Sequence, residues 1–373
     1  MNAADARIAV VFGGPSPEHD VSVLTGLQAV RELERSGRDV TALYWSKTGG
    51  WHRVPGDLEA GDFVQGVPRG AEPLRLVVGD EGGFVVAGGR LGRQRAVPLD
   101  VVVVCCHGAP GEDGTLQGAL DLAGLAHTGP DVAGAALGMD KLAFAGVVAA
   151  GGLPCLQRQI LGAHTTSVGF EGPYIVKPRF GGSSIGIDVV ADLGTAVARL
   201  RANPHLRHGA VVEPYRPDLF DCNVAVRTWP ELTVSAVERP LRSASGGEIL
   251  GYLDKYAGGE GMVSAPRELP AKLTGALTER VRDLAGTVAE LCGTRGVARV
   301  DFLCDGIDVW VNEINTVPGS LARYLWVDPP VAFGDLLNGL VAEAIERPTG
   351  RHSATGADGV VLRGAGSIAA KLA

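Results

Sequence analysis

The sequence lacks the features of a membrane protein. No stretch approaches the roughly 18 consecutive uncharged apolar residues that a membrane-spanning helix needs, and the longest comparable run is Val101 to Cys106. The N-terminal residues MNAADAR contain no hydrophobic signal segment. We therefore expect a cytoplasmic protein with no membrane partner.

Positive charge is scarce and is not concentrated in any segment. The 373 residues include 34 Lys and Arg against 42 Asp and Glu, which gives a formal net charge of -8. Because the basic residues are scattered, no cluster predicts binding to nucleic acid or to an anionic membrane. Any anion that the protein binds must be held by local groups.

The sequence also lacks the cysteine patterns of zinc sites and disulfide-rich domains. Its six cysteines form no CxxC pair, and Cys105 and Cys304 lie inside apolar runs. Reduced thiols in the core are the expected state.

Strand and helix patterns alternate in the first part of the chain. Arg7–Phe12 is an apolar strand that ends in a glycine pair, and apolar residues then recur at helical spacing from Val21 to Leu33. Further strands are predicted at Val40–Trp45 and Val101–Cys106, and a helix from about Leu116. This alternation predicts an α/β fold with a parallel, doubly wound sheet over roughly the first 135 residues, with ligands at the strand ends.

The remainder of the chain mixes strands and helices without that regular alternation. The predicted elements are a helix at Asp140–Ala150, strands at Tyr174–Pro178, Gly209–Glu213, Val224–Arg227 and Leu232–Val237, a helix from Leu273 to about Cys292, and a strand pair at Val297–Leu303 and Val309–Asn315.

The last strand pair carries polar residues in a suggestive pattern. If the first strand ends at Leu303 and the second already starts at Ile307, a three-residue loop of Cys304, Asp305 and Gly306 joins them. The odd-numbered residues of both strands then share one face. A two-residue Asp-Gly turn would instead separate Asp301 from Glu313. We predict the three-residue loop, a polar face of Arg299, Asp301, Glu313 and Asn315, and a core face of Val300, Phe302, Trp310 and Ile314. Carboxylate and amide oxygens suit Mg²⁺, and the alternative is an exposed acidic strand end.

A second segment points to phosphate. The strand YIVKP delivers Lys177 and runs directly into a loop of glycines and serines, RFGGSS. Backbone N–H groups and hydroxyls of such a loop can surround phosphate oxygens while the ammonium neutralises them. A plain linker is the alternative reading, and no Walker sequence is present. Beside an oxygen-rich metal face, phosphate binding is the better interpretation.

Several blocks occur in an order that resembles one known family. VFGGPSPEHDVSVLTG is similar to a glycine turn, HGAPGEDGTLQGALDLAGLAHTG to a second signature, and LGMDKLAF to a nucleotide-binding helix. VKPRFGGSSIGI is similar to a phosphate loop, and GVARVDF with NEINTVPG to metal and oxyanion segments. Over about Arg7 to Leu325 the chain thus resembles the ATP-grasp superfamily and, within it, the D-alanine:D-alanine ligase family.

The resemblance implies a three-domain ATP-grasp architecture, in which an N-terminal doubly wound parallel sheet precedes two α+β domains that clamp ATP. The implied boundaries are 1–137 for the substrate domain, 138–222 for the central subdomain, 223–347 for the catalytic domain and 348–373 for a tail that we expect to be partly mobile. It also implies that ATP phosphorylates one amino acid to an acyl phosphate, which the amine of a second then attacks. D-alanine, peptidoglycan precursor synthesis and a homodimer are the corresponding expectations.

The resemblance assigns roles to individual positions. Nucleotide contacts would come from Lys141, Lys177, Gly182, Ser183, Ser184, Glu213 near the adenine, Asp221, and Lys255 on a mobile lid. Two Mg²⁺ ions, with Mn²⁺ as a substitute, would bind Asp301, Glu313 and Asn315. Glu18 would pair with the first substrate's ammonium in a trio with Ser183 and Tyr256, and Arg299 with the N–H of Gly319 would stabilise the oxyanion. Tyr256 as a mere lid residue, and structural roles for His19 and His107, are the alternatives.

Two segments depart from the family pattern. The hinge EPYRPDLFDCNV lacks the usual Gly-x-Glu, so Asp221 as a ribose-side or metal-side carboxylate is a hypothesis. After Gly319, Tyr324 stands where the family places a serine for the acceptor carboxylate, with Arg323 beside it. Either Arg323 binds that carboxylate or the acceptor is not D-alanine. A dipeptide or amide ligase of specialised metabolism, and a non-catalytic nucleotide-binding module, therefore stay open.

Overall fold

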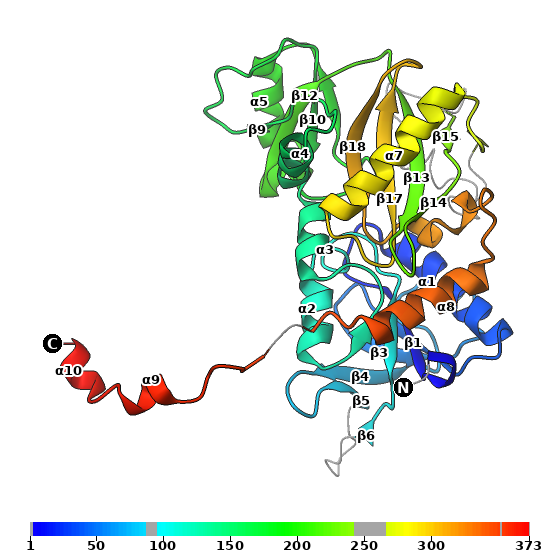
Figure 1. Ribbon diagram of the computed structural model, residues 1–373, viewed down its shortest axis with the longest axis vertical. Helices are drawn as coiled ribbons and strands as arrows, with labels where there is room; N and C mark the ends of the chain where they lie inside the picture. The colour runs from blue at the N-terminus through cyan, green and yellow to red at the C-terminus, as the bar shows by residue number, and fades with distance from the viewer. Residues whose placement is uncertain (1–2, 87–94, 242–265, 351–352, 373) are drawn as a thin grey trace.

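The computed structural model describes residues 3–86, 95–241, 266–350 and 353–372. Lys255 and Tyr256 lie outside the described residues. An eight-stranded sheet fills one end of the molecule, and two four-stranded sheets lie side by side at the other end (Figure 1). The α/β class and the ATP-grasp arrangement of sheets are as predicted, whereas the domain boundaries stay a prediction.

The eight-stranded sheet has the order β6-β5-β4-β3-β2-β1-β7-β8. Its strands are β1 Ile8–Gly13, β2 Val40–Trp45, β3 Trp51–Val54, β4 Glu72–Val77, β5 Gly83–Val86, β6 Arg95–Ala96, β7 Val101–Val104 and β8 Ala126–His127. Only β2, β1, β7 and β8 pair in parallel, and the other four form an antiparallel meander. The prediction of a wholly parallel sheet was therefore wrong for residues 51–96. The reason is physical, because the five residues 46–50 between β2 and β3 are too few for a crossover helix.

Helices cover the parallel half of this sheet. They are α1 His19–Arg35, α2 Thr115–Leu122 and α8 Phe333–Glu346, with short 3-10 turns η1 Ala3–Asp5 and η2 Ala60–Phe63. Helix α8 was not predicted, and it packs on β7, β8 and α1. Its Leu337 and Val341 share one core with Val10 and Val102, so segments from both ends of the chain stabilise the same sheet.

The second sheet is antiparallel and has the order β11-β10-β12-β9. Its elements are β9 Gln159–Leu161, β10 Tyr174–Pro178, β11 Asp188–Val190, β12 Ala210–Pro214, α5 Leu193–Ala202 and the turn η3 Pro204–His208. Ahead of it, α3 Val132–Met139 and α4 Lys141–Ala150 meet at Asp140, whose carboxylate caps α4 by accepting the N–H groups of Leu142 and Ala143.

The third sheet, β14-β13-β17-β18, is covered by α7 and α4. Its elements are β13 Phe220–Arg227, β14 Thr233–Val234, α7 Gly275–Leu291, β17 Val297–Cys304, β18 Val309–Asn315 and the turn η5 Gly319–Leu325, beside a small sheet of β15 Arg239–Pro240 and β16 Arg267–Glu268. Phe144 of α4 and Val281 of α7 pack against Val300 and Ile314.

The β17–β18 hairpin differs from the predicted one and still forms the predicted polar face. Four residues, Asp305 to Asp308, make the turn, because the Asp305 carboxylate accepts the N–H groups of both Ile307 and Asp308. The three-residue loop was therefore wrong. A bulge between Asp301 and Phe302 in the pairing with β18 then shifts the register, so that Asp301 opposes Glu313 and Arg299 opposes Asn315.

The same bulge moves one predicted core residue. Trp310 pairs with Leu303, and the guanidinium carbon of Arg216 lies 5.5 Å from the Trp310 ring centroid. Val309 and Val311 take the core positions instead. The assignment of Trp310 to the core was wrong for this reason.

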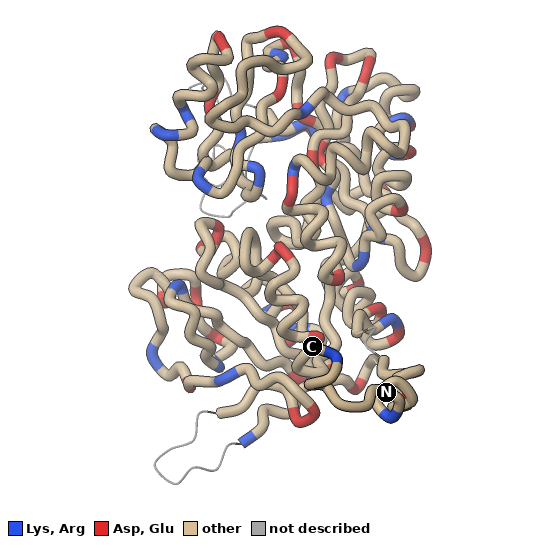
Figure 2. Tube along the Cα trace, turned by 90° about the vertical axis from the view of Figure 1, so that its left-hand side faces the viewer, with Lys and Arg blue, Asp and Glu red and all other residues tan. Residues whose placement is uncertain are grey.

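The tail carries α9 Val360–Arg363 and α10 Ile368–Leu372, whose side chains are exposed and which extend away from the body in Figure 1. All six cysteines are free. Among the described residues, no helix combines the length and apolar character needed to cross a bilayer. Basic and acidic residues are interleaved through both halves of the trace (Figure 2).

Candidate active site

A pocket of about 150 Å³ lies between the second and third sheets. Lys177 of β10 and Glu313 of β18 both line it, although 135 residues separate them in sequence. The predicted nucleotide and metal positions that line it are Lys141, Lys177, Gly182, Ser184, Glu213, Asp221, Asp301 and Glu313. An adjoining smaller pocket is lined by Glu18, His107, Glu112, Ser183, Arg299, Glu313, Asn315 and Gly319, among others. We call these the nucleotide pocket and the substrate pocket, after the roles that the sequence predicts for their lining residues.

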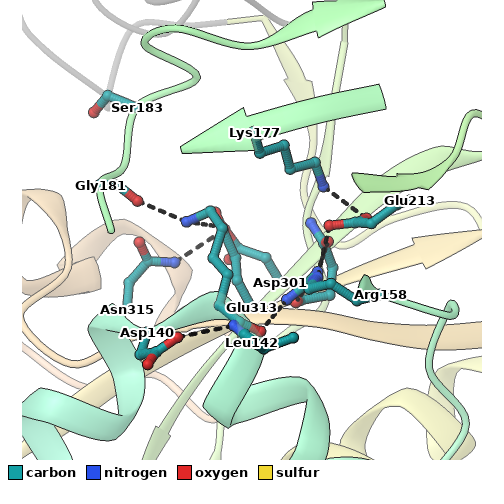
Figure 3. Close-up of polar contacts among 12 residues, drawn as sticks. Asp140, Leu142, Arg158, Lys177, Gly181, Ser183, Glu213, Asp301, Glu313 and Asn315 are labelled. Atoms are coloured by element: carbon teal, nitrogen blue, oxygen red, sulfur yellow. Dashed lines mark hydrogen bonds and ion pairs between the residues drawn. The ribbon is translucent and has the colours of Figure 1, made fainter. Parts of the chain in front are cut away.

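The cations of the nucleotide pocket are paired with carboxylates (Figure 3). Nζ of Lys177 lies 2.9 Å from Oε2 of Glu213, its diagonal neighbour on the adjacent strand. Nζ of Lys141 lies 3.2 Å from Oε2 of Glu313 and donates to the Gly181 carbonyl at 2.6 Å. Both lysines are buried. The ammonium groups of both lysines therefore belong to the wall of the pocket, and each lies beside a carboxylate.

Arg158, which sequence reasoning missed, does not line either pocket but bonds to the pocket residue Glu213. Its Nε lies 2.6 Å from Oε1 of Glu213, and its other nitrogens donate to the carbonyls of Lys141 and Asn312. Burial raises the pKa of Glu213, but Arg158 and Lys177 outweigh that effect and lower it to about 2. Arg158 lies directly before β9, between Gln157 and Gln159. A single arginine between two glutamines matches no motif that would predict a binding site.

The polar face of the hairpin has the donor set of a magnesium site. Arg299 forms two hydrogen bonds to the Asp301 carboxylate, at 2.6 and 2.7 Å, and Nδ2 of Asn315 donates to Asp301 at 3.0 Å. Glu313 lies opposite Asp301 on the neighbouring strand. Two carboxylates and an amide oxygen on one face fit Mg²⁺, which binds few protein oxygens and keeps other positions for water and phosphate.

The substrate pocket joins the phosphate loop to the first sheet. The Ser183 hydroxyl donates to Oε1 of Glu18. Ser183 and Ser184 have φ angles of 53° and 58°, a left-handed conformation that is costly for residues other than glycine. The hydrogen bond to Glu18 helps to hold this strained loop. It also brings together Glu18 and Ser183, two members of the predicted trio.

Glu112 is a second buried carboxylate in this pocket, and it was missed as an individual residue within the glycine-rich signature. It accepts the N–H groups of Gly108 at 3.1 Å and Val317 at 2.8 Å. Burial, with a smaller contribution from the negative charge of Glu18, raises the pKa of Glu112 to about 7.

A relay of hydrogen bonds fixes the turn that contains Gly319. Nδ1 of His107 lies 2.7 Å from the Val317 carbonyl, Nε2 lies 2.8 Å from Oγ1 of Thr25, and Thr25 accepts the N–H of Ser320 at 3.0 Å. These contacts require His107 to carry its proton on Nδ1. Burial lowers the pKa of His107 to about 4, which keeps the ring neutral.

The relay supports a turn with unusual geometry. Ser320, Leu321 and Ala322 have φ angles of 51°, 49° and 51°, all left-handed. Both ring nitrogens of His107 thus make structural hydrogen bonds, which was one of the two roles considered for this residue. His19 is held similarly, with Nδ1 2.6 Å from the Gly14 carbonyl and Nε2 3.1 Å from the Tyr44 hydroxyl.

The predicted acceptor residues lie apart from each other. Arg323 lines neither pocket, since its Nε donates to Gln28 at 3.4 Å and its guanidinium carbon lies 5.4 Å from the Phe333 ring centroid. Tyr324 points the other way, and the guanidinium carbon of Arg267 lies 4.6 Å from its ring centroid. The Tyr324 hydroxyl is buried without a hydrogen-bond partner among the described residues, and burial raises its pKa.

Arg267 and Glu238 are further pocket residues that sequence reasoning missed. Nη1 of Arg267 lies 2.9 Å from Oε1 of Glu238, and Asn223 donates to the other oxygen of Glu238 at 3.0 Å. Both residues line the nucleotide pocket, as Arg299 does.

Two sheets that enclose one pocket, with lysines on one side and a carboxylate face on the other, define an ATP-grasp enzyme. Comparison with known proteins agrees: the family model described as the D-ala D-ala ligase N-terminus matches residues 7–130, and that of the D-ala D-ala ligase C-terminus matches residues 135–342. The chain belongs to the D-alanine–D-alanine ligase family, which comprises ATP-dependent ligases that form carbon–nitrogen bonds.

Relatives with curated names cover nearly the whole chain. A D-alanine--D-alanine ligase of Nocardia farcinica is 33% identical over 366 residues, which span 92% of this chain and 98% of the relative. One from Methylobacterium sp. (strain 4-46) is 34% identical over 375 residues, 94% of each chain.

Solved structures share the fold. The D-alanine-D-alanine ligase from Coxiella burnetii superposes with a TM-score of 0.75 at 24% identity, covering 92% of this chain and 95% of that one. The VanG D-Ala:D-Ser ligase from Enterococcus faecalis gives a TM-score of 0.72 at 24% identity, with 91% and 99% covered.

Proposed function

We propose that this protein joins two molecules of D-alanine, with ATP converting the carboxylate of the first into an acyl phosphate and the amine of the second displacing the phosphate. The product is D-alanyl-D-alanine, which serves peptidoglycan precursor synthesis. The single observation that carries the proposal is the pocket shared by Lys177 and Glu313, because it brings phosphate-binding and metal-binding groups within reach of one triphosphate.

The residues of the substrate pocket support roles in binding the first amino acid and in stabilising the oxyanion. The Glu18 carboxylate would bind the ammonium of the first amino acid, and Ser183 orients that carboxylate. Arg299 lines both pockets, so it lies between the nucleotide and the substrate, where negative charge develops on the attacked carboxyl group. The N–H of Gly319 would be the second donor to this oxyanion.

The nucleotide pocket supplies the remaining groups. Lys141 and Lys177 would bind phosphate oxygens, with Gly182 and Ser184 of the loop, and Asp301, Glu313 and Asn315 would hold two divalent ions. Such ions, when bound, neutralise charge on the transferring phosphoryl group. Lys255 and Tyr256 keep their proposed roles as phosphate and substrate contacts.

A second candidate function differs from the first in the acceptor amino acid. Arg267 and Glu238 form an ion pair in the pocket that Arg299 also lines, and the Tyr324 ring packs on Arg267. This surrounding favours, as a second candidate, a ligase that joins D-alanine to an acceptor other than D-alanine. The homodimer, the cytoplasmic location and Mn²⁺ as a substitute for Mg²⁺ remain proposals.

The test is amino-acid-dependent release of ADP with D-alanine alone and with a panel of L- and D-amino acids, with product masses recorded. We expect ADP release with D-alanine alone and a product of the mass of D-alanyl-D-alanine. A mixed dipeptide without D-alanyl-D-alanine would support the second candidate, and no ADP with any amino acid would support the non-catalytic module.

A further inference from the structure

Two cations hold the Glu213 carboxylate from opposite sides (Figure 3). Arg158 bonds Oε1 at 2.6 Å and Lys177 bonds Oε2 at 2.9 Å. The side chains of Arg158, Glu213 and Lys177 are 4%, 1% and 9% exposed, so water screens none of these charges. A carboxylate buried this deeply needs one cation, and here it has two.

The two cations are anchored differently. Arg158 also donates to the Lys141 carbonyl at 2.6 Å and the Asn312 carbonyl at 3.2 Å, which ties it to α4 and β18. Among the described residues, the ammonium of Lys177 makes one hydrogen bond, the one to Glu213. Arg158 is therefore fixed by three elements, whereas Lys177 is held at its tip by a single contact.

Two other ion pairs of the pocket contain a carboxylate that is a proposed metal ligand, which Glu213 is not. Lys141 pairs with Glu313 and Arg299 pairs with Asp301. Glu313 and Asp301 are proposed metal ligands, so bound Mg²⁺ would offset their charge in place of Lys141 and Arg299. Glu213 is on β12, away from the proposed metal face on β17 and β18, so a metal ion there would not take the place of Lys177.

We infer that Arg158 is the permanent counter-ion of Glu213, which allows Lys177 to leave that carboxylate and bind nucleotide phosphate. The inference rests on the proposed function, because it takes Lys177 to be a phosphate ligand. The Arg158 guanidinium stays in place because it holds the Glu213 carboxylate and two backbone carbonyls at once. The low pKa of Glu213 agrees with a surplus of positive charge around it. Arg158 is thus a positioning residue that acts through Glu213 on Lys177.

The test measures the dissociation constant of a non-hydrolysable ATP analogue, adenylyl imidodiphosphate with Mg²⁺, together with thermal unfolding of the nucleotide-free protein. In Arg158→Met, Glu213 retains Lys177 as its one cation, so we expect the dissociation constant to rise about tenfold or more. In the double variant Arg158→Met/Glu213→Gln no carboxylate remains at position 213 to hold Lys177, so we expect it to bind the analogue more tightly than Arg158→Met. Its melting temperature should also exceed that of Arg158→Met.

Two further variants separate this role from a general need for a buried arginine. Arg295→Met removes another buried arginine, one that bonds the Gly129 and Arg347 carbonyls outside both pockets, and should leave the dissociation constant unchanged. Arg158→Lys keeps a cation beside Glu213, and because the inference needs only that charge, its dissociation constant should stay within about threefold of the parent. If Arg158→Met does not fold, the double variant and Arg158→Lys carry the comparison.

The inference is overturned if Arg158→Met binds the analogue as tightly as the parent, if the double variant binds no better than Arg158→Met, or if Arg158→Lys loses affinity about tenfold. A parent protein that binds no nucleotide at all would instead refute the proposed function, and the inference with it.

Discussion

Glu213 in the nucleotide pocket and Glu112 in the substrate pocket are the same residue type, and both are buried. Their pKa values nevertheless lie on opposite sides of the ordinary value, at about 2 and about 7. Glu213 faces two cations, whereas Glu112 faces two backbone N–H groups and the like charge of Glu18, with Arg299 exerting a weaker attraction.

The difference agrees with the ligands of opposite charge that we propose for the two pockets. Among the described residues of the nucleotide pocket, Lys141 and Lys177 each have a carboxylate partner, which phosphate would replace in the proposed function. In the substrate pocket, two carboxylates lie close enough to repel, so an incoming ammonium relieves repulsion between Glu18 and Glu112. One continuous site can therefore hold a polyanion and an amino group side by side.

The largest effect is expected from breaking the metal face of the nucleotide pocket. Asp301→Asn removes a metal-binding charge and the partner of Arg299, so ligase activity should fall about a thousandfold or more. Steady-state kinetics with saturating ATP and D-alanine measure this. Asp305→Asn, on the exposed turn of the same hairpin, is the matched control and should retain activity.

The next largest effect concerns the proton on Glu112. Its folded-state pKa of about 7 exceeds the ordinary 4.5, so its contribution to stability is full below pH 4.5 and is lost as the pH rises through 7. The loss corresponds to about 3 kcal/mol. Glu112→Gln cannot ionise, so urea unfolding of this variant at pH 4.5 and pH 8 should lack that difference. An equal loss in variant and parent would contradict the assignment.

The variant Glu18→Gln tests whether the two pockets bind different substrates. Loss of the charge that binds the first substrate's ammonium should raise the KM for the first amino acid about a hundredfold and leave the KM for ATP unchanged. Asp20→Asn, one residue into α1 from His19 and paired with the exposed Lys47, is the control. A change confined to the KM for ATP would mean that the pockets are not divided as described.

The smallest effect is expected at the relay that fixes the Gly319 turn. Thr25→Val removes the acceptor for the Ser320 N–H and the donor to His107, so kcat should fall about tenfold with little change in either KM. Thr25→Ser keeps the hydroxyl and should restore most of the rate. Equal losses in the two variants would point to packing and not to the hydrogen bonds.

The sequence was informative where chemistry is concentrated in short motifs. The polar face of Arg299, Asp301, Glu313 and Asn315 was predicted correctly, because alternation along two strands places such residues together. The prediction was right in spite of a wrong loop, since the longer turn and the bulge compensate each other. Neither the Asp305 hydrogen bonds nor the bulge leaves a pattern that alternation alone could identify.

Other features were unpredicted for different reasons. Helix α8 has apolar residues at helical spacing, Leu336, Leu337, Leu340 and Val341, so its signal was present and was overlooked. Arg158 has no such signal, because its importance comes from Glu213 lying beside it on a neighbouring strand. Arg323 was chosen for its charge, and the left-handed turn directs it toward Gln28 and Phe333.

The most direct test of the account uses D-alanine whose carboxylate oxygens are labelled with ¹⁸O. If Lys177 and the Asp301–Glu313 face act on one triphosphate beside the carboxylate held near Arg299, one labelled oxygen per turnover should appear in the inorganic phosphate, as detected by mass spectrometry. Dipeptide formation that releases only unlabelled phosphate would contradict phosphorylation of the carboxylate, and with it the shared site proposed here.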